Sequence, residues 1–172
     1  MSKTDINQTK LPPGVSIRHE LKPGDIGYLT YLNGTLYAKE CGWDSTFEAY
    51  VAVPLSEFAK SHTDREQIWL VEREGRLAGS IAIVQATQET AQLRWLLLHP
   101  DLRGLGLGRT LVEDAMSFCR KSGYHSMYLW TESRLTAAAD LYRMTGFQLT
   151  EEKTHELWGT VVTEQRYDLN FP

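Results

Sequence analysis

The chain has 172 residues, of which 42% are hydrophobic, and its 18 basic and 22 acidic residues give a formal net charge of −4. This length is close to that of one domain, and the apolar content can bury a sizeable core, which excludes a largely disordered chain. The mild acidic balance lacks the basic excess of a protein that binds phosphate backbones, so it argues against a nucleic-acid-binding protein.

The N-terminal segment and the cysteines predict the cellular setting. Residues 1–14 are polar and lack the apolar run of a secretory signal, so we expect a flexible tail followed by one domain at residues 15–172. No apolar stretch approaches the ~20 residues that span a bilayer, which predicts no membrane partner. Cys41 and Cys119 match no metal-ligand spacing and are too few for a disulfide framework, so we expect reduced thiols, no bound metal and a cytoplasmic location.

The first half of the chain predicts a strand, two helices and a meander of three strands. Alternating apolar and polar residues predict a strand at 15–21, and a Pro-Gly-Asp turn then starts a helix that runs to about Glu40. Apolar residues at near-helical steps predict a second helix over 47–58, with an interruption near Pro54. The three strands of the meander are expected at 68–72, 77–85 and 90–98.

The second half of the chain alternates helices with strands. Residues 107–121 carry their apolar side chains on one helical face and end before Gly123, which makes this the clearest helix. Ser133 or Thr136 is expected to cap a further helix that ends at Met144. The remaining strands are expected at 124–130, 147–149 and 160–169.

This order of elements predicts the fold class. A meander of strands followed by alternating helices and strands indicates an α/β (α+β) protein. We expect a mixed, mostly antiparallel sheet of six or seven strands with helices on both faces.

A glycine-rich loop joins the strand that ends at Leu98 to the helix that begins at Leu107. Glycines at 104, 106 and 108 remove Cβ atoms where the strand turns into the helix, so backbone N–H groups can converge on an anion. The loop has no lysine for a Walker A motif, and its G-x-G-x-G spacing differs from the Rossmann G-x-G-x-x-G. It therefore predicts another type of phosphate site, with a turn that uses glycine only for its geometry as the alternative.

Two linked motifs resemble the GNAT superfamily of acetyl-CoA-dependent N-acetyltransferases. Residues 103–108, RGLGLG, resemble the R/Q-x-x-G-x-G/A loop that wraps the CoA pyrophosphate in that family. Residues 141–147, LYRMTGF, resemble its L-Y-x-x-x-G-F segment, and residues 96–100 resemble the strand that enters the loop. The resemblance covers roughly residues 15–169 and is closest to the acetyltransferase half of fused MarR-type regulator and acetyltransferase proteins.

The resemblance implies that acetyl-CoA is the co-substrate and that the strand before the loop carries a bulge and splays from the following strand. The pantetheine arm then bonds to the backbone of the opened edge, whose side chains can be plain leucines. Many family members hold this arm with an Asn at the position where this chain has Leu135. The residues implied to bind CoA are Leu96, Leu97, Leu98, Arg103, Gly104, Leu105, Gly106, Leu107, Gly108, Arg109, Thr110, Ser133, Ala138 and Tyr142.

The resemblance also implies a catalytic role for Tyr142, which matches the phenol that protonates the departing CoA thiolate; aromatic packing is the alternative. The acceptor amine must lose a proton, which requires a base. The candidate bases are Glu40, Asp44 and Glu132, with His155 as a weaker one. Each of these carboxylates has the alternative of a solvated surface position. The aromatic residues that could wall an acceptor pocket are Trp43, Phe47 and Trp158.

Two functions from different classes fit these residues. The first is an N-acetyltransferase that transfers an acetyl group directly to a primary amine of a small molecule or peptide in a ternary complex. The second is a catalytically weak CoA-binding sensor, which the missing Asn and the unidentified base favour. The family resemblance also allows a homodimer.

Overall fold

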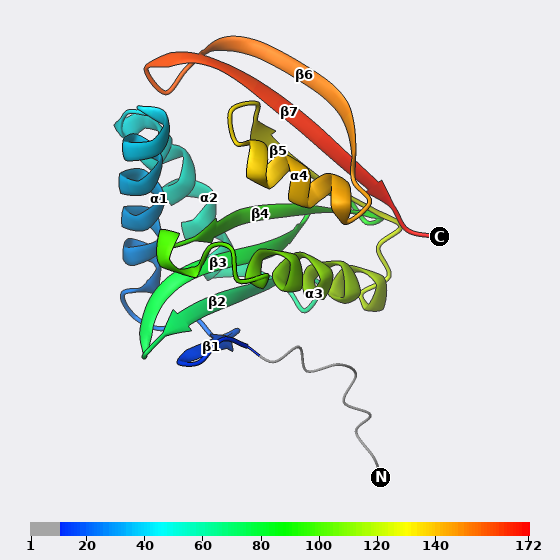
Figure 1. Ribbon diagram of the computed structural model, residues 1–172. Coiled ribbons are helices and arrows are strands. Elements are labelled where there is room, and N and C mark those ends of the chain that lie inside the picture. Colours follow the sequence, from blue (N-terminus) through cyan, green and yellow to red (C-terminus); the bar gives the residue numbers. More distant parts are fainter. Residues whose placement is uncertain (1–10) are drawn as a thin grey trace.

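Seven strands and four α-helices make up residues 11–172, which the computed structural model describes (Figure 1). The helices are α1 (Asp25–Cys41), α2 (Ser45–Ser61), α3 (Leu107–Lys121) and α4 (Thr136–Met144), with a short 3-10 helix, η1, at Pro100–Leu102. The strands are β1 (Val15–Arg18), β2 (Gln67–Arg73), β3 (Arg76–Gln85), β4 (Thr90–Leu98), β5 (Ser126–Glu132), β6 (Gln148–Leu157) and β7 (Thr160–Asn170).

The strands form one sheet in the order β1-β2-β3-β4-β5-β7-β6. Among the strands of residues 11–172, β4 and β5 pair in parallel and every other neighbouring pair is antiparallel. Helices cover both faces, with α1 and α2 on one side and α3 and α4 on the other (Figure 1). The predicted fold class, a mixed and mostly antiparallel sheet between helices, is confirmed.

The alternation of side chains along the central strands gives the sheet two cores. Trp69 and Val71 of β2 pack in the core under α3, while Ile68 and Leu70 pack in the core under α1 and α2. All four are at most 3% exposed, and burying such a side chain contributes about 1.5–3 kcal/mol. The strands are buried on both faces, which explains their nearly continuous apolar sequences.

The structure corrects the prediction that α2 is interrupted near Pro54, because the helix is continuous through this residue. A proline inside a helix removes one hydrogen bond and costs about 3 kcal/mol. The buried residues on the inner face of α2 pack on both sides of Pro54, and this packing outweighs the local cost. They are Phe47, Val51, Leu55 and Phe58.

The ends of the chain differ from the expected pattern. The strand expected at 147–149 is the longer β6, whose residues are mostly exposed, so burial leaves no apolar alternation to reveal it. Of the expected tail at residues 1–14, the first ten lie outside the described residues, and Leu11 packs against the core under α3. No helix within residues 11–172 has the length and apolar character needed to cross a membrane.

A β-bulge interrupts the pairing of β3 with β4. Ser80 pairs with Leu97 and Ala82 with Arg94, so β4 has one residue more than β3 in this interval. Trp95 in the bulge has a φ of 51°, and the buried Ser80 hydroxyl donates a hydrogen bond of 2.7 Å to its carbonyl oxygen. A Cβ on Gly79 would lie 2.5 Å from the Leu97 carbonyl oxygen, so the strands approach closely beside the bulge. The bulge that the family resemblance implied is confirmed.

Replacing Ser80 by alanine is expected to lower the free energy of unfolding by about 1–3 kcal/mol, because the carbonyl of Trp95 then loses the donor that the buried Ser80 supplies. Urea denaturation followed by circular dichroism measures the change. Ser56→Ala is the matched control, since the exposed Ser56 hydroxyl bonds to the Ala52 carbonyl within one helix. Equal stability of S80A and S56A would show that the bulge does not depend on this bond.

Candidate active site

The sheet opens between β4 and β5 (Figure 1). These strands pair only through residues 90–92 of β4 and 126–128 of β5, and they diverge beyond this point. A pocket lies where they have separated, and its wall includes Leu96, Thr131 and Glu132. The predicted splay is therefore confirmed. It leaves one backbone edge of β4 without a neighbouring strand, as an extended ligand that hydrogen-bonds to main-chain groups requires.

The N-terminus of α3 is shaped to receive an anion. The helix begins at Leu107, and its N-cap residue Gly106 has a φ of 77°, a conformation that only glycine adopts readily. No side chain caps this end, and the first turn contains no acidic residue. The first N–H groups of a helix have no partner within the helix and attract negative charge. Residues 104–106 are exposed, so the diphosphate of CoA fits the donor set that this loop presents.

The side chain of Arg103 connects this loop to β4 and α1. Its Nε donates to the Leu98 carbonyl oxygen at 3.1 Å, and its guanidinium lies 2.8 Å from the Glu40 carboxylate. This pair brings together a residue expected to bind CoA and a residue expected to act as a base. Neither side chain lines the pocket. The ion pair supports a role for Glu40 in positioning the loop. The role of Glu40 as a base stays a prediction, because its side chain does not line the pocket.

The other predicted residues of the loop lie in the first turns of α3. Arg109 forms an exposed ion pair with Glu113 at 2.8 Å, and the Thr110 hydroxyl donates to the Gly106 carbonyl at 3.2 Å. Leu105 is 54% exposed, whereas Leu107 is buried in the core. The exposed residues flank the helix N-terminus, and Leu107 anchors the helix to the sheet.

The side chain of Tyr142 in α4 packs in the core under α3 and also lies at the pocket. Its side chain is 5% exposed, and its ring centroid lies 5.9 Å from those of Phe147 and Tyr167. It also lines the pocket at the splay. Burial raises the pKa of the Tyr142 phenol well above its ordinary value, with smaller contributions from Tyr37 and Tyr167. The phenol is protonated at neutral pH, as an ordinary tyrosine is, and carries one O–H donor.

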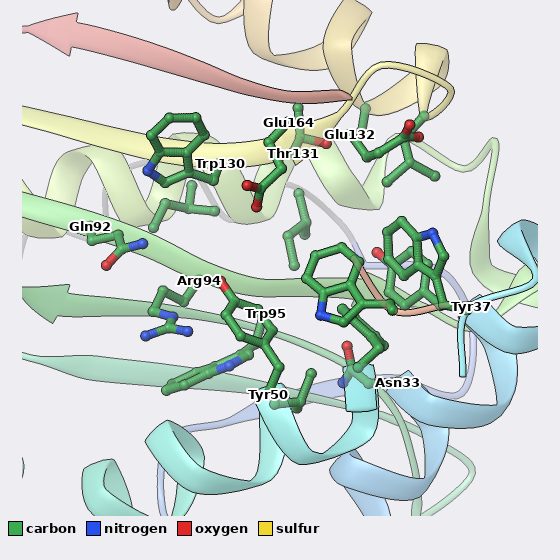
Figure 2. Close-up of a pocket in the computed structure, with 18 of the residues that line it drawn as sticks. Asn33, Tyr37, Tyr50, Gln92, Arg94, Trp95, Trp130, Thr131, Glu132 and Glu164 are labelled. Atoms are coloured by element: carbon green, nitrogen blue, oxygen red, sulfur yellow. The ribbon is translucent and has the colours of Figure 1, made fainter. Parts of the chain in front are cut away.

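Two carboxylates lie opposite each other on the neighbouring strands β5 and β7, where Glu132 pairs with Glu164. Glu132 is 2% exposed and accepts bonds from the backbone N–H and the Nε of Arg134, at 2.9 and 3.1 Å. Glu164 lies 2.7 Å from Nε2 of the exposed His155. Both carboxylates line the pocket (Figure 2).

The sequence analysis missed Glu164, although a signal for it exists. Val162 of β7 packs in the core under α1 and α2, and Glu164 is two residues further along the same strand. Side chains two residues apart share a face of a strand, so Glu164 points to the side that carries the pocket. An acidic residue at such an inward position marks a functional candidate.

Aromatic side chains form another part of the pocket wall. Trp43 and Trp158 have ring centroids 4.5 Å apart, and Phe47 lies 4.6 Å from Trp43 and 4.8 Å from Trp158. The structure thus brings together all three residues expected to wall an acceptor pocket. Asp44, the neighbouring candidate base, caps α2 by accepting the Thr46 N–H at 2.9 Å and does not line the pocket. Thr131, which the sequence offered with Ser133 and Thr136 as a substitute for the missing Asn, also lines the pocket, and further lining residues that the sequence did not single out are Asn33, Tyr50, Gln92, Arg94, Trp95 and Trp130.

The start of α4 corrects the prediction of a Ser133 or Thr136 cap. The N-cap residue is Leu135, whose side chain cannot accept a hydrogen bond, and Thr136 is the first helical residue. Ser133 lies too early in the turn, and its hydroxyl is 3.4 Å from the Glu132 carboxylate. Leu135 and Ala138 line the pocket, so the position where many relatives of the resembled family carry Asn is apolar here.

The chain matches a known family over this same region. Residues 35–147, which include β4, the loop, α3 and Tyr142, match the Acetyltransferase (GNAT) family. The chain therefore belongs to the acetyltransferase (GNAT) family. A relationship to the MarR-type fusions is not shown by the comparisons.

Curated relatives agree with this assignment. The chain is 31% identical over 150 residues to an uncharacterized N-acetyltransferase of Schizosaccharomyces pombe, which covers 84% of this chain and 89% of the relative. It is 24% identical over 127 residues to human N-acetyltransferase 8B, covering 70% of this chain and 56% of the relative. The chain thus spans most of the yeast protein but little more than half of the human one.

Solved structures share the fold at low sequence identity. An acetyltransferase from Streptococcus agalactiae superposes with a TM-score of 0.75 at 22% identity, covering 92% of this chain and 99% of that one. Spermidine N-acetyltransferase from Vibrio cholerae, solved with CoA and spermine, superposes with a TM-score of 0.69 at 20% identity, covering 91% and 95%. A Salmonella typhimurium protein solved with its cofactor acetyl-CoA gives a TM-score of 0.71 at 19% identity, covering 91% and 94%.

Replacing Tyr142 by phenylalanine is expected to reduce the loss of stability at alkaline pH. The folded-state pKa of this phenol is raised above the unfolded value of about 10, so its burial stabilises the fold fully below pH ~10 and progressively less above it. The free energy of unfolding, measured in urea at pH 8 and pH 11, should therefore fall less for Y142F than for the wild type.

Tyr31→Phe serves as the control, because this side chain is 57% exposed. Between pH 8 and pH 11, the free energy of unfolding of Y31F should change by as much as that of the wild type. An equal loss of stability in Y142F and Y31F would contradict a raised pKa at Tyr142.

Proposed function

We propose that this protein is an acetyl-CoA-dependent N-acetyltransferase that transfers an acetyl group directly to a primary amine of a small molecule in a ternary complex. The observation that carries the proposal is the pocket at the splay of β4 and β5. It is lined by the buried phenol of Tyr142 and by the carboxylate of Glu164, which contacts the exposed His155. The family assignment supports the reaction class.

The chain has two sets of backbone groups for the co-substrate. The N–H groups of residues 104–109 at the N-terminus of α3 would hold the diphosphate, because no side chain within residues 11–172 caps that end, whereas the Thr110 N–H already donates to the Gly106 carbonyl. The free edge of β4 at residues 96–98 would hold the pantetheine arm. Ser133, Leu135 and Ala138 flank the thioester end through the start of α4. Acetyl-CoA supplies the acetyl group as an activated thioester.

Glu164 and His155 provide a path for the proton that the acceptor must lose. An amine attacks as the neutral base, so its ammonium form has to give up a proton inside the pocket. Glu164 faces the pocket and lies 2.7 Å from Nε2 of His155, which is exposed. We assign Glu164 as the group that accepts the proton and His155 as the group that passes it to water. Glu132 is engaged by Arg134 and is the second candidate for the same role.

Tyr142 acts on the other side of the reaction. As the new C–N bond forms, the C–S bond breaks and negative charge develops on sulfur. The protonated phenol of Tyr142 lines the same pocket and donates its hydrogen to that sulfur, after which solvent restores the phenol. The products are the N-acetylated amine and CoA with its thiol protonated.

Introducing a glutamate at Gly106 is expected to weaken acetyl-CoA binding by about 100-fold or more, because it adds a negative charge and a Cβ at the anion site. Isothermal titration of acetyl-CoA and CoA measures the change. Gly123→Glu is the matched control, since Gly123 has a similar positive φ, 81°, with open space around it at the opposite end of α3. If the wild type binds neither ligand, or if both variants bind like the wild type, the proposed co-substrate site is overturned.

Replacing Glu164 by glutamine is expected to lower kcat by about 100-fold while leaving acetyl-CoA affinity within about twofold, since the amide cannot accept the acceptor's proton. A thiol-release assay with a panel of primary amines gives kcat, and titration gives the affinity. Glu156→Gln, an exposed change on the same hairpin, is the control. Thiol release by E164Q at the wild-type rate would reassign the base, and no release by the wild type with any amine would favour the CoA-binding sensor.

A further inference from the structure

Arg94 differs from the other charged residues of the pocket. Within residues 11–172, the carboxylate of Glu132 is paired with Arg134 at 3.1 Å, and that of Glu164 lies 2.7 Å from His155. The guanidinium of Arg94 forms no ion pair with any described carboxylate. It instead lies over aromatic rings, 5.0 Å from the Trp95 centroid and 5.8 Å from that of Tyr50.

The carboxylates that share a pocket or hollow with Arg94 have other partners. Arg94 also borders a neighbouring hollow that is lined by Glu57 and Glu66. Glu66 accepts the backbone N–H groups of Thr63 and Gln85 at 2.9 and 3.0 Å, and Glu57 lies 3.7 Å from Lys60. An arginine has five N–H donors that match a carboxylate in a planar fork. These donors of Arg94 are therefore left for a ligand.

The position of Arg94 directs it toward the acceptor rather than toward CoA. It is the residue of β4 directly before the bulge at Trp95, on the strand face opposite Leu93, which is buried under α3. Figure 2 shows Arg94 from β4, Tyr50 from α2 and Glu164 from β7 around the same pocket. The pocket thus has a cation on one strand and an anion on another, on either side of the splay.

Two indole donors in this region also lack an acceptor. Nε1 of Trp43 and Nε1 of Trp95 are buried, and neither has a hydrogen-bond partner among the described residues. Both side chains line the pocket. Buried donors are nearly always satisfied in folded proteins, so these two call for a ligand that carries acceptor oxygens.

We propose that the acceptor is an α-amino acid with an apolar or aromatic side chain, and that Arg94 recognises its carboxylate. The ammonium of such a compound faces Glu164, and its side chain packs against the cluster of Trp43, Phe47 and Trp158. A planar guanidinium over aromatic rings holds a carboxylate by two parallel hydrogen bonds. This assignment rests on the proposed acetyltransferase function and specifies its substrate class.

The same charges disfavour other amines. A polyamine, such as the spermine in the Vibrio cholerae structure, carries no anion for Arg94 and adds positive charge beside it. An amine that lacks the carboxylate leaves the guanidinium donors of Arg94 without an anion in the pocket. Selectivity for amino acids over their decarboxylated counterparts therefore follows from the side chains in the wall.

The test compares matched acceptors that differ only in the carboxylate. The two matched pairs are L-phenylalanine with phenethylamine and L-leucine with isopentylamine, and thiol release is measured with each compound. Spermidine is tested separately as a polyamine. The wild type is expected to use the amino acids with kcat/KM about 10- to 100-fold higher than the matched amines. Arg94→Gln should lower kcat/KM for the amino acids by a similar factor and leave the matched amines within about twofold. Arg76→Gln, an exposed change on β3, is the control.

The outcomes separate this proposal from the one on which it rests. Recognition by Arg94 would be overturned if the wild type had the same kcat/KM for the matched amines as for the amino acids. It would also be overturned if R94Q lowered kcat/KM equally for both groups of compounds. If none of the compounds releases thiol, the proposed acetyltransferase function is overturned. Isothermal titration of the same amino acids in the presence of CoA then shows whether they still bind at the proposed acceptor site. Binding that R94Q abolishes supports the site without catalysis, and no binding overturns it.

Discussion

The bulge in β4 is the feature on which the rest of the site depends. An extra residue in one strand bends it and increases its local twist, and the pairing of β4 with β5 ends at residue 92, just before the bulge. The hydroxyl of the buried Ser80 donates a hydrogen bond to the Trp95 carbonyl in the bulge. A single hydrogen bond between neighbouring strands thus stabilises the opening that becomes the pocket.

The two sides of that opening use different chemical groups. On the side of β4 and α3, the available donors and acceptors are main-chain atoms, fixed by secondary structure and by the left-handed conformation of Gly106. The wall toward α1, α2 and the β6–β7 hairpin consists of side chains, most of them aromatic, and the charged side chains of the pocket are Arg94 of β4, Glu132 of β5 and Glu164 of β7. Tyr142 lies at the boundary, where burial raises the pKa of its phenol.

Much of the fold could be predicted because burial leaves periodic traces in the sequence. The helix over 107–121 and the fold class were predicted correctly from such periodicity, and the glycine spacing located the loop. The length of β6 was missed because an exposed strand has no apolar alternation, and the break at Pro54 was predicted wrongly because the packing of α2 outweighs a local preference. Glu164 and Arg94 were missed because their proximity depends on strand pairing between distant segments.

The division between main-chain and side-chain groups has a consequence for how such a protein diverges. Most substitutions leave a backbone N–H or C=O in place, so the proposed co-substrate site would tolerate sequence changes as long as the bulge and Gly106 persist. The aromatic wall has no such protection, because its contacts are the side chains themselves. Trp158, at the turn of the β6–β7 hairpin, joins that wall from the far end of the chain. Under the proposed function, a mutation in this turn would therefore alter which amine is accepted without altering how the acetyl donor is bound.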